Sequence, residues 1–122
     1  MRAVAVMSPS DLITGMFRAI DDARWEALTD FLDDDVIYER PGYPRLVGSD
    51  RVRHFYEVER MIASGTHTIE HIVIAGHHGA CWGELVGLSK TGSEIAERFA
   101  DVYEFANGKI KTRRSHFFRP AV

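Results

Sequence analysis

The chain has 122 residues, a length that suits one domain with a single hydrophobic core. Hydrophobic residues make up 45% of it and charged residues 27%, a composition that is typical of a globular protein and excludes a disordered chain. The net charge of −3 gives no electrostatic reason to expect nucleic acid or an anionic membrane as a partner. We therefore expect one domain over residues 1–122 that binds neither.

The sequence carries few signs of a targeting segment or a redox site. Residues 1–7 are too short for the apolar core of a signal peptide, and no apolar run reaches the length of a membrane span. Cys81 is the single cysteine, which excludes an internal disulfide and a cysteine-based zinc cage. We therefore expect a cytoplasmic protein, and the sequence indicates neither a metal nor a cofactor.

The first part of the chain predicts two helices. Ser8 and Pro9 start the first one, because a serine N-cap and a proline in the first turn suit the beginning of a helix. Apolar residues then recur at helical spacing to about residue 22. Residues 25–32 continue as a second short helix, and the acidic run 33–35 ends it as a solvated loop.

The rest of the chain predicts one more helix among strands. A strand over residues 36–40 precedes a third helix, which begins at the cap Ser49, runs to about residue 64 and ends at Gly65. Four further strands are expected at residues 66–75, 81–89, 95–106 and 109–119. Each is separated from the next by a short turn.

The last two strands fold back on each other at Asn107-Gly108, because both central positions of a type I′ turn need positive φ. Helices that come first and an antiparallel meander that comes last form an α+β pattern. We expect a curved antiparallel sheet that wraps around the helices as a cone. The open mouth of such a cone is a natural ligand pocket.

A buried carboxylate is predicted in this pocket. Alternation places Asp101 between Phe99 and Tyr103 on a half-buried strand face, where a charge is costly unless it is paired or protonated. The same alternation on neighbouring strands predicts a pocket lined by Tyr38, Arg40, Trp82, Glu84, Phe99, Asp101, Arg113, Ser115 and Phe117. Phe55 of the third helix and Met16 of the first are expected to contact a ligand as well.

These residues allow a catalytic and a structural interpretation. Proton transfer needs a carboxylic group whose pKa is moved towards neutrality by burial. Glu84 is the candidate base, Asp101 or Tyr38 is the candidate proton donor, and Arg40 is placed to hold an enolate or a substrate carboxylate. In the structural interpretation the two acids pair with Arg40 and Arg113 as buried ion pairs.

The histidines do not indicate a metal site. His67 and His71 are four residues apart, but their alternating context favours a strand, on which they are ordinary neighbours on one face. His77 and His78 lie in a predicted turn. The sequence places no third ligand beside either pair, so we expect no metal.

Three segments together resemble the nuclear-transport-factor-2-like superfamily, in its SnoaL-like and ketosteroid-isomerase-like branch. They are LTDFLDDDVIYERPG, VGSDRVRHFYE and FADVYEFANGKIKTRRSHFF, and the resemblance covers residues 11–118. It implies a cone-shaped α+β fold with an interior apolar pocket, and a homodimer formed through the outer face of the sheet. The superfamily contains isomerases, polyketide cyclases, epoxide hydrolases, dehydratases and non-catalytic binding modules, so the fold alone fixes no activity.

The resemblance to a ketosteroid isomerase covers part of its machinery. Asp101 takes the place of the neutral carboxylic acid in that family's oxyanion hole, whereas Arg40 and Met16 stand where its aspartate base and oxyanion tyrosine belong. Steroid isomerisation with that machinery is therefore not expected. The resemblance implies a protein that binds a small apolar carbonyl compound, as a cofactor-independent isomerase, cyclase or dehydratase. The alternative is a non-catalytic ligand-binding or dimerisation module.

Overall fold

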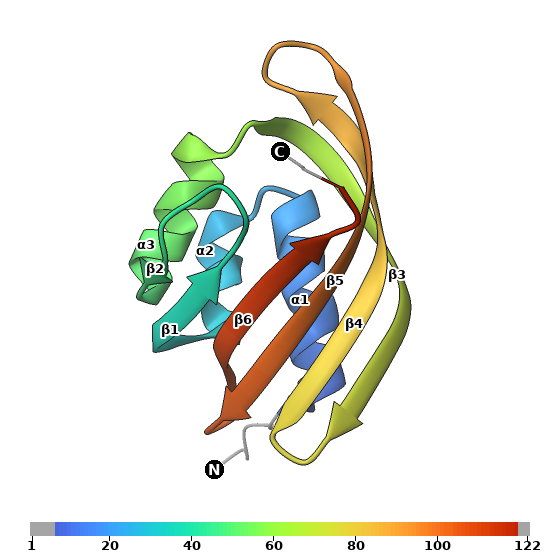
Figure 1. Cartoon of the computed structure of the whole chain (residues 1–122). Helices are drawn as coiled ribbons and strands as arrows, with labels where there is room; N and C mark the ends of the chain where they lie inside the picture. The colour runs from blue at the N-terminus through green and yellow to red at the C-terminus, as the bar shows by residue number, and fades with distance from the viewer. Residues whose placement is uncertain (1–6, 120–122) are drawn as a thin grey trace.

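The computed structural model describes residues 7–119, and Figure 1 shows a curved sheet wrapped around one long helix. The helical elements are α1 (Pro9–Asp21), α2 (Trp25–Leu28), a 3-10 turn η1 (Thr29–Phe31), α3 (Ser49–His54) and a π-helical turn η2 (Phe55–Glu59). The strands are β1 (Leu32–Glu39), β2 (Leu46–Val47), β3 (Ile62–Ala75), β4 (His78–Ser89), β5 (Glu94–Ala106) and β6 (Lys109–Phe117). None of the helices within residues 7–119 has the length and apolar character that crossing a bilayer requires.

The strands form one sheet in the order β2-β1-β6-β5-β4-β3. Neighbours are antiparallel except β1 and β6, which run parallel. Helix α1 lies in the concave side of this sheet, while α2 and α3 lie on the side next to β1 (Figure 1). The expected α+β fold, with a curved sheet around helices, is confirmed.

The hydrophobic core lies between α1 and the inner face of the sheet. The helix buries its apolar stripe, Leu12, Ile13, Met16, Phe17 and Ile20, as helical spacing predicts. The side-chain oxygen of Ser8 accepts a hydrogen bond from the Asp11 backbone N–H at 3.1 Å and so caps the helix. The strands β5 and β6 contribute Phe99, Tyr103, Phe105 and Ile110 to the same core. Burial of this apolar surface is the main force that holds helix and sheet together.

Two predicted boundaries are wrong. The acidic run 33–35 belongs to β1 and not to a loop, and the pairing of β1 with β6 is irregular at this point. The third helix ends at Glu59 instead of near residue 64, because Arg60 has extended backbone dihedrals. Gly65 is therefore an interior residue of β3, where β4 packs closely against it, and does not end a helix.

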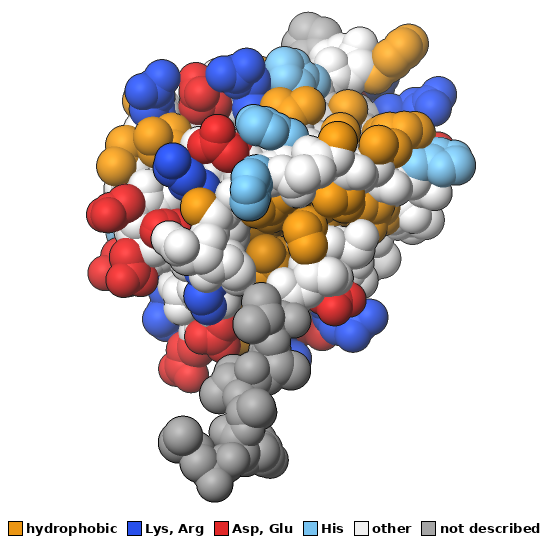
Figure 2. All heavy atoms as spheres, turned by 90° about the horizontal axis from the view of Figure 1, so that it is seen from below, with side chains coloured by type: hydrophobic (Ala, Val, Ile, Leu, Met, Phe, Trp, Pro, Cys, Tyr) orange, Lys and Arg blue, Asp and Glu red, His pale blue; other side chains and the backbone are white. Residues whose placement is uncertain are grey.

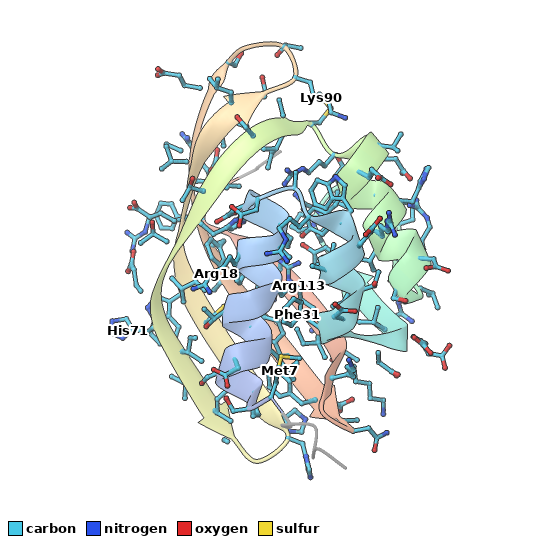
Figure 3. The ribbon with its side chains drawn as sticks, turned by 180° about the vertical axis from the view of Figure 1, so that it is seen from behind. Met7, Arg18, Phe31, His71, Lys90 and Arg113 are labelled. Atoms are coloured by element: carbon cyan, nitrogen blue, oxygen red, sulfur yellow. The ribbon has the colours of Figure 1, made fainter. Side chains whose placement is uncertain are left out.

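A bulge in β3 decides which of its side chains face the interior. The register between β3 and β4 shifts between Ile69 and His71, and one extra residue reverses the alternation of a strand. His67 consequently packs against Phe17 of α1, with ring centroids 4.6 Å apart. His71 points away from the sheet (Figure 3) and lies beside Trp82, with ring centroids 5.1 Å apart. The expectation that His67 and His71 share one face is therefore wrong.

Gly83 lets β4 pass close to β3. A Cβ at this position would lie 1.9 Å from the Thr68 carbonyl oxygen, which is far inside van der Waals contact. Gly83→Ala is expected to lower the free energy of unfolding, measured in urea, by about 1–3 kcal/mol, the usual cost of overpacking. Glu84→Ala is the matched control, because Glu84 is exposed on the opposite face and its loss should change stability by less than about 0.5 kcal/mol. Equal effects of the two substitutions would contradict a close contact at Gly83.

Candidate functional site

A small cavity lies inside the cone, between the inner face of the sheet and η2. Its volume is about 20 Å³, which is space for about one water molecule. It is lined by Tyr38, Arg40, Tyr56, Arg60, Ile62, His67, Leu85, Phe99, Asp101, Arg113, Ser115 and Phe117. Charged side chains and hydroxyl groups share this wall with apolar side chains and aromatic rings, so the interior is not the purely apolar pocket that was expected.

Asp101 and Arg113 form a buried ion pair in the cavity wall. They lie on the neighbouring strands β5 and β6, and Arg113 Nε donates to Asp101 Oδ2 at 2.8 Å. The side chain of Arg113 is 6% exposed and that of Asp101 is 1% exposed. Figure 3 shows Arg113 inside the molecule beside α1. Burial by itself lowers the pKa of Arg113, but the charge of Asp101 raises it well above its ordinary value. The guanidinium therefore stays charged and holds the carboxylate.

Hydroxyl groups extend this ion pair across the cavity. Arg113 Nη1 donates to Tyr56 Oη at 2.7 Å, and the Tyr56 hydroxyl donates to Tyr38 Oη at 3.5 Å. The hydroxyls of Tyr38 and Ser115 are hydrogen-bonded at 2.8 Å. Burial raises the pKa of Tyr38. Burial alone would raise the pKa of Tyr56 too, but the charges of Arg113 and Arg40 lower it below its ordinary value. Tyr56 is therefore the better proton donor to a developing oxyanion.

His67 and Asp21 form a second polar pair at the cavity. Asp21, the last residue of α1, accepts the His67 backbone N–H on Oδ2 at 2.8 Å, and its Oδ1 lies 2.5 Å from His67 Nδ1. In the neutral imidazole, a hydrogen bond from Nδ1 to the Asp21 carboxylate would leave Nε2 with its lone pair. The ring is also packed against Phe17 and Phe99, with centroid distances of 4.6 Å and 5.5 Å. This is the arrangement of a general base that is held in one tautomer and one orientation.

Two further arginines at the cavity are stacked on aromatic rings. The guanidinium carbon of Arg40 lies 4.9 Å from the ring centroid of Phe55. That of Arg60 lies 5.4 Å from the ring centroids of both Trp25 and Tyr56. Arg60 is 5% exposed, and its burial lowers its pKa. The cavity wall therefore carries guanidinium groups from three arginines, counting Arg113.

Cys81 lies behind the ion pair and is fully buried. Its Sγ is 3.6 Å from the hydroxyl of Tyr103, which donates to Asp101 Oδ2 at 2.9 Å. Burial raises the pKa of the Cys81 thiol to about 11, and the charge of Asp101 adds to the effect. Because the folded pKa is the higher one, this thiol stabilises the fold below the ordinary thiol pKa, and that contribution is lost as the pH rises towards 11.

The thiol of Cys81 is therefore expected to resist alkylation in the folded protein. Only a thiolate attacks iodoacetamide at an appreciable rate, and the buried thiol stays protonated at pH 8. We expect little modification of the native protein at pH 8 and full modification after unfolding in urea, with mass spectrometry of timed samples as the measurement. Rapid modification of the native protein would contradict the buried position.

The structure brings most of the predicted pocket residues together. The cavity wall contains Tyr38, Arg40, Phe99, Asp101, Arg113, Ser115 and Phe117, and their roles towards a ligand stay predictions. Met16 and Phe55 are fully buried in the surrounding core and do not line the cavity. No group of three or more His, Cys, Asp or Glu side chains is arranged for a metal ion in the described part of the chain.

The expectation that Trp82 and Glu84 line the pocket is wrong. The register pairs Asp101 with Cys81, so the odd-numbered residues of β4 face inward together with Asp101. Trp82 and Glu84 consequently point outward and are exposed. Glu84 is not part of the cavity wall and so does not serve as its base, and the acid that does lie inside pairs with Arg113.

Sequence reasoning missed Asp21, Tyr56, Arg60 and His67 as parts of the site. Asp21 and His67 are 46 residues apart, so no local pattern links them. Tyr56 lies in η2, and π-helical turns are rare elements that often occur at functional sites. The one available signal was the strand alternation around His67, which places it on the same face as Ile69.

These features define a class of protein: a small α+β cone with a polar interior cavity and an imidazole held at the cavity wall. Residues 13–113 match the SnoaL-like domain family, and the chain belongs to this family. The match confirms the resemblance that the three sequence segments indicated. No curated protein sequence matches the chain.

Solved structures share the fold at low sequence identity. An NTF2-like protein of unknown function from Burkholderia pseudomallei is 21% identical, with a TM-score of 0.81 over 91% of this chain and 92% of that one. A Catenulispora acidiphila protein with a ketosteroid isomerase-like fold, in complex with trimethylamine, is 18% identical, with a TM-score of 0.79 over 90% and 86%. An LEH-like epoxide hydrolase from M. tuberculosis is 18% identical, with a TM-score of 0.76 over 87% and 79%. These likenesses confirm the NTF2-like fold.

Proposed function

We propose that this SnoaL-like protein is a cofactor-independent enzyme that moves a proton at the carbon next to a carbonyl group. It would act on a small molecule in the cone, as an isomerase, cyclase or dehydratase. The observation that supports this is the Asp21–His67 pair, with Nδ1 held at 2.5 Å beside a cavity that is rich in hydrogen-bond donors. A positioned base that faces donors for an oxyanion is what proton abstraction beside a carbonyl requires.

In the proposed reaction, Nε2 of His67 removes a proton from carbon, and the electron pair of the C–H bond moves into an enolate. The Tyr56 hydroxyl turns its hydrogen from Tyr38 to the enolate oxygen and donates a hydrogen bond to it. Arg113 donates to Tyr56 at 2.7 Å and makes it a better donor, while Asp101 holds the guanidinium in place. The proton on Nε2 then returns to another carbon or to a leaving hydroxyl group, so that isomerisation and dehydration share the first step.

Deuterium exchange tests this proposal without knowledge of the natural substrate. The protein is incubated in D2O with a panel of small ketones, and NMR follows the loss of the signal of the protons beside the carbonyl. We expect faster exchange with the protein than in buffer, and loss of the acceleration in His67→Gln. Acceleration that persists in His67→Gln would assign the base elsewhere.

One observation favours a second candidate, a non-catalytic ligand-binding module. The cavity of about 20 Å³ admits a ligand only when side chains on its wall move. In that case ketones would shift NMR signals of the protein, while none would exchange faster than in buffer. That outcome would exclude the enzyme and retain the binding module.

We also propose that a second copy of the chain is a partner, bound through the outer face of the sheet. Four apolar side chains on this face are exposed: Val73 (52%), Trp82 (36%), Val86 (56%) and Val102 (41%). Figure 2 views the molecule from below, and it shows apolar side chains that gather in one area at this end of the molecule. Exposed apolar area of this kind marks interfaces between proteins.

Val102→Asp is therefore expected to convert a dimer into a monomer. The introduced carboxylate has to be desolvated in an apolar interface, and its cross-strand neighbour Arg114 offsets this cost only in part. Sedimentation velocity measures the change. Val58→Asp is the matched control, because Val58 is 54% exposed but lies in η2, away from the sheet. A wild-type chain that stays monomeric at high concentration would contradict the proposal.

A further inference from the structure

Arg60 is a buried cation whose contacts are aromatic rings. It is 5% exposed, and the rings of Trp25 and Tyr56 lie 5.4 Å from its guanidinium carbon. Within residues 7–119 its guanidinium forms no hydrogen bond and no ion pair. Arginine side chains are almost never buried to this extent unless an anion pairs with them. The side chain lines the cavity, so an anion in the cavity can reach it.

The carboxylates near this site are already bonded to other residues. Asp21 accepts two hydrogen bonds from His67, and Asp101 forms the ion pair with Arg113. Three guanidinium groups lie at the cavity with the carboxylates of Asp101 and Asp21, an excess of one positive charge when the imidazole is neutral. A wall with this charge attracts an anion and disfavours a cation.

We propose that the substrate is a small oxo acid whose carboxylate binds the guanidinium of Arg60. This inference rests on the function proposed above, because it names the substrate class of the same site. The donor fork of a guanidinium matches the two oxygens of a carboxylate with parallel hydrogen bonds.

Tyr56 connects this carboxylate site to the proposed chemistry. Its ring stacks against Arg60, and its hydroxyl accepts from Arg113 at 2.7 Å. The guanidinium of Arg60 and the hydroxyl of Tyr56 are therefore neighbours. An acid bound at Arg60 would lie close to the hydroxyl that would stabilise the enolate. Arg60 is held by stacking on aromatic rings and not by an ion pair. Its side chain can therefore move when a substrate enters.

A matched pair of compounds tests the proposal. We would titrate the protein with 4-oxopentanoate and with methyl 4-oxopentanoate, which share the ketone and differ in the carboxylate, and measure Kd by NMR. We expect the acid to bind at least about tenfold more tightly than the ester. Arg60→Gln should abolish the difference. Arg53→Gln should preserve it, because Arg53 lies on the surface beside Glu57 at 3.8 Å.

The outcomes separate this inference from the proposed function. If the acid binds no more tightly than the ester to the wild-type protein, the inference is wrong, whether or not either compound exchanges deuterium. A preference that persists in a folded Arg60→Gln would overturn the role of Arg60. If Arg60→Gln does not fold, Arg60→Lys takes its place, and loss of the fork should reduce the preference. Tight binding of the acid without any deuterium exchange would refute the proposed function alone.

Discussion

Arg113→Met is expected to lower the free energy of unfolding by about 3–5 kcal/mol, because it leaves a buried charge without its partner. Asp101 is 1% exposed and would keep the hydroxyl of Tyr103 as its remaining donor. Its Oδ1 already has no hydrogen-bond partner among residues 7–119, so no second oxygen compensates for the loss. Urea unfolding followed by circular dichroism measures the change.

Arg114→Met is the matched control, since it removes the same group from the next residue of β6. Arg114 pairs with Glu39 at 3.3 Å, but its side chain is 57% exposed, and exposed pairs contribute about 0–1 kcal/mol. The double variant Asp101→Leu/Arg113→Met is expected to be more stable than Arg113→Met alone, because it removes the unpaired charge. A loss at Arg113 no larger than the loss at Arg114 would refute this account of the pair.

His67→Gln is expected to reduce deuterium exchange by a factor of about 10²–10⁴, the usual contribution of a general base. Glutamine can still donate a hydrogen bond to Asp21, which accepts from the His67 backbone and ring, but it has no basic nitrogen. We therefore expect a melting temperature close to that of the wild type together with the loss of exchange. Comparable losses of stability and exchange would favour a structural role for His67.

His71→Gln and Asp21→Asn complete this test. His71 lies on the same strand but on the outer face, so its replacement should leave exchange unchanged. Asp21 is a positioning residue, because it acts through the imidazole. Asp21→Asn should reduce exchange, and ¹⁵N NMR of the imidazole should show that the Nδ1-protonated tautomer is no longer fixed. An unchanged tautomer in this variant would contradict the assigned role of Asp21.

Local sequence patterns predicted the elements whose partners are neighbours along the chain. The apolar stripe of α1 is buried as its spacing indicates. The turn at Asn107-Gly108 has positive φ at both residues and joins β5 to β6. The register of the two strands shifts between Glu104 and Phe105, and this irregularity places Arg113 on the inner face together with Asp101.

Alternation failed in β4, because its two faces do not differ in hydrophobicity as a half-buried strand's faces usually do. The inner face contains Cys81, Gly83 and Leu85, and the outer face contains Trp82, Glu84 and Val86. The largest of these side chains, Trp82, lies on the outer face, so the strand pattern favoured the wrong face. The inner face needs glycine, since a Cβ at Gly83 would collide with the backbone of β3.

The sequence by itself determined the α+β class, the hairpin and the position of the buried carboxylate, because these depend on spacing within one or two adjacent elements. The tertiary structure decided the groups that we propose for the chemistry. His67 reaches Asp21 because β3 packs along α1, and a bulge two residues further on reverses the alternation that follows. Tyr56 reaches Arg113 across 57 residues from a π-helical turn. Contacts of this kind depend on how the sheet curves around α1, and no short stretch of sequence contains that information.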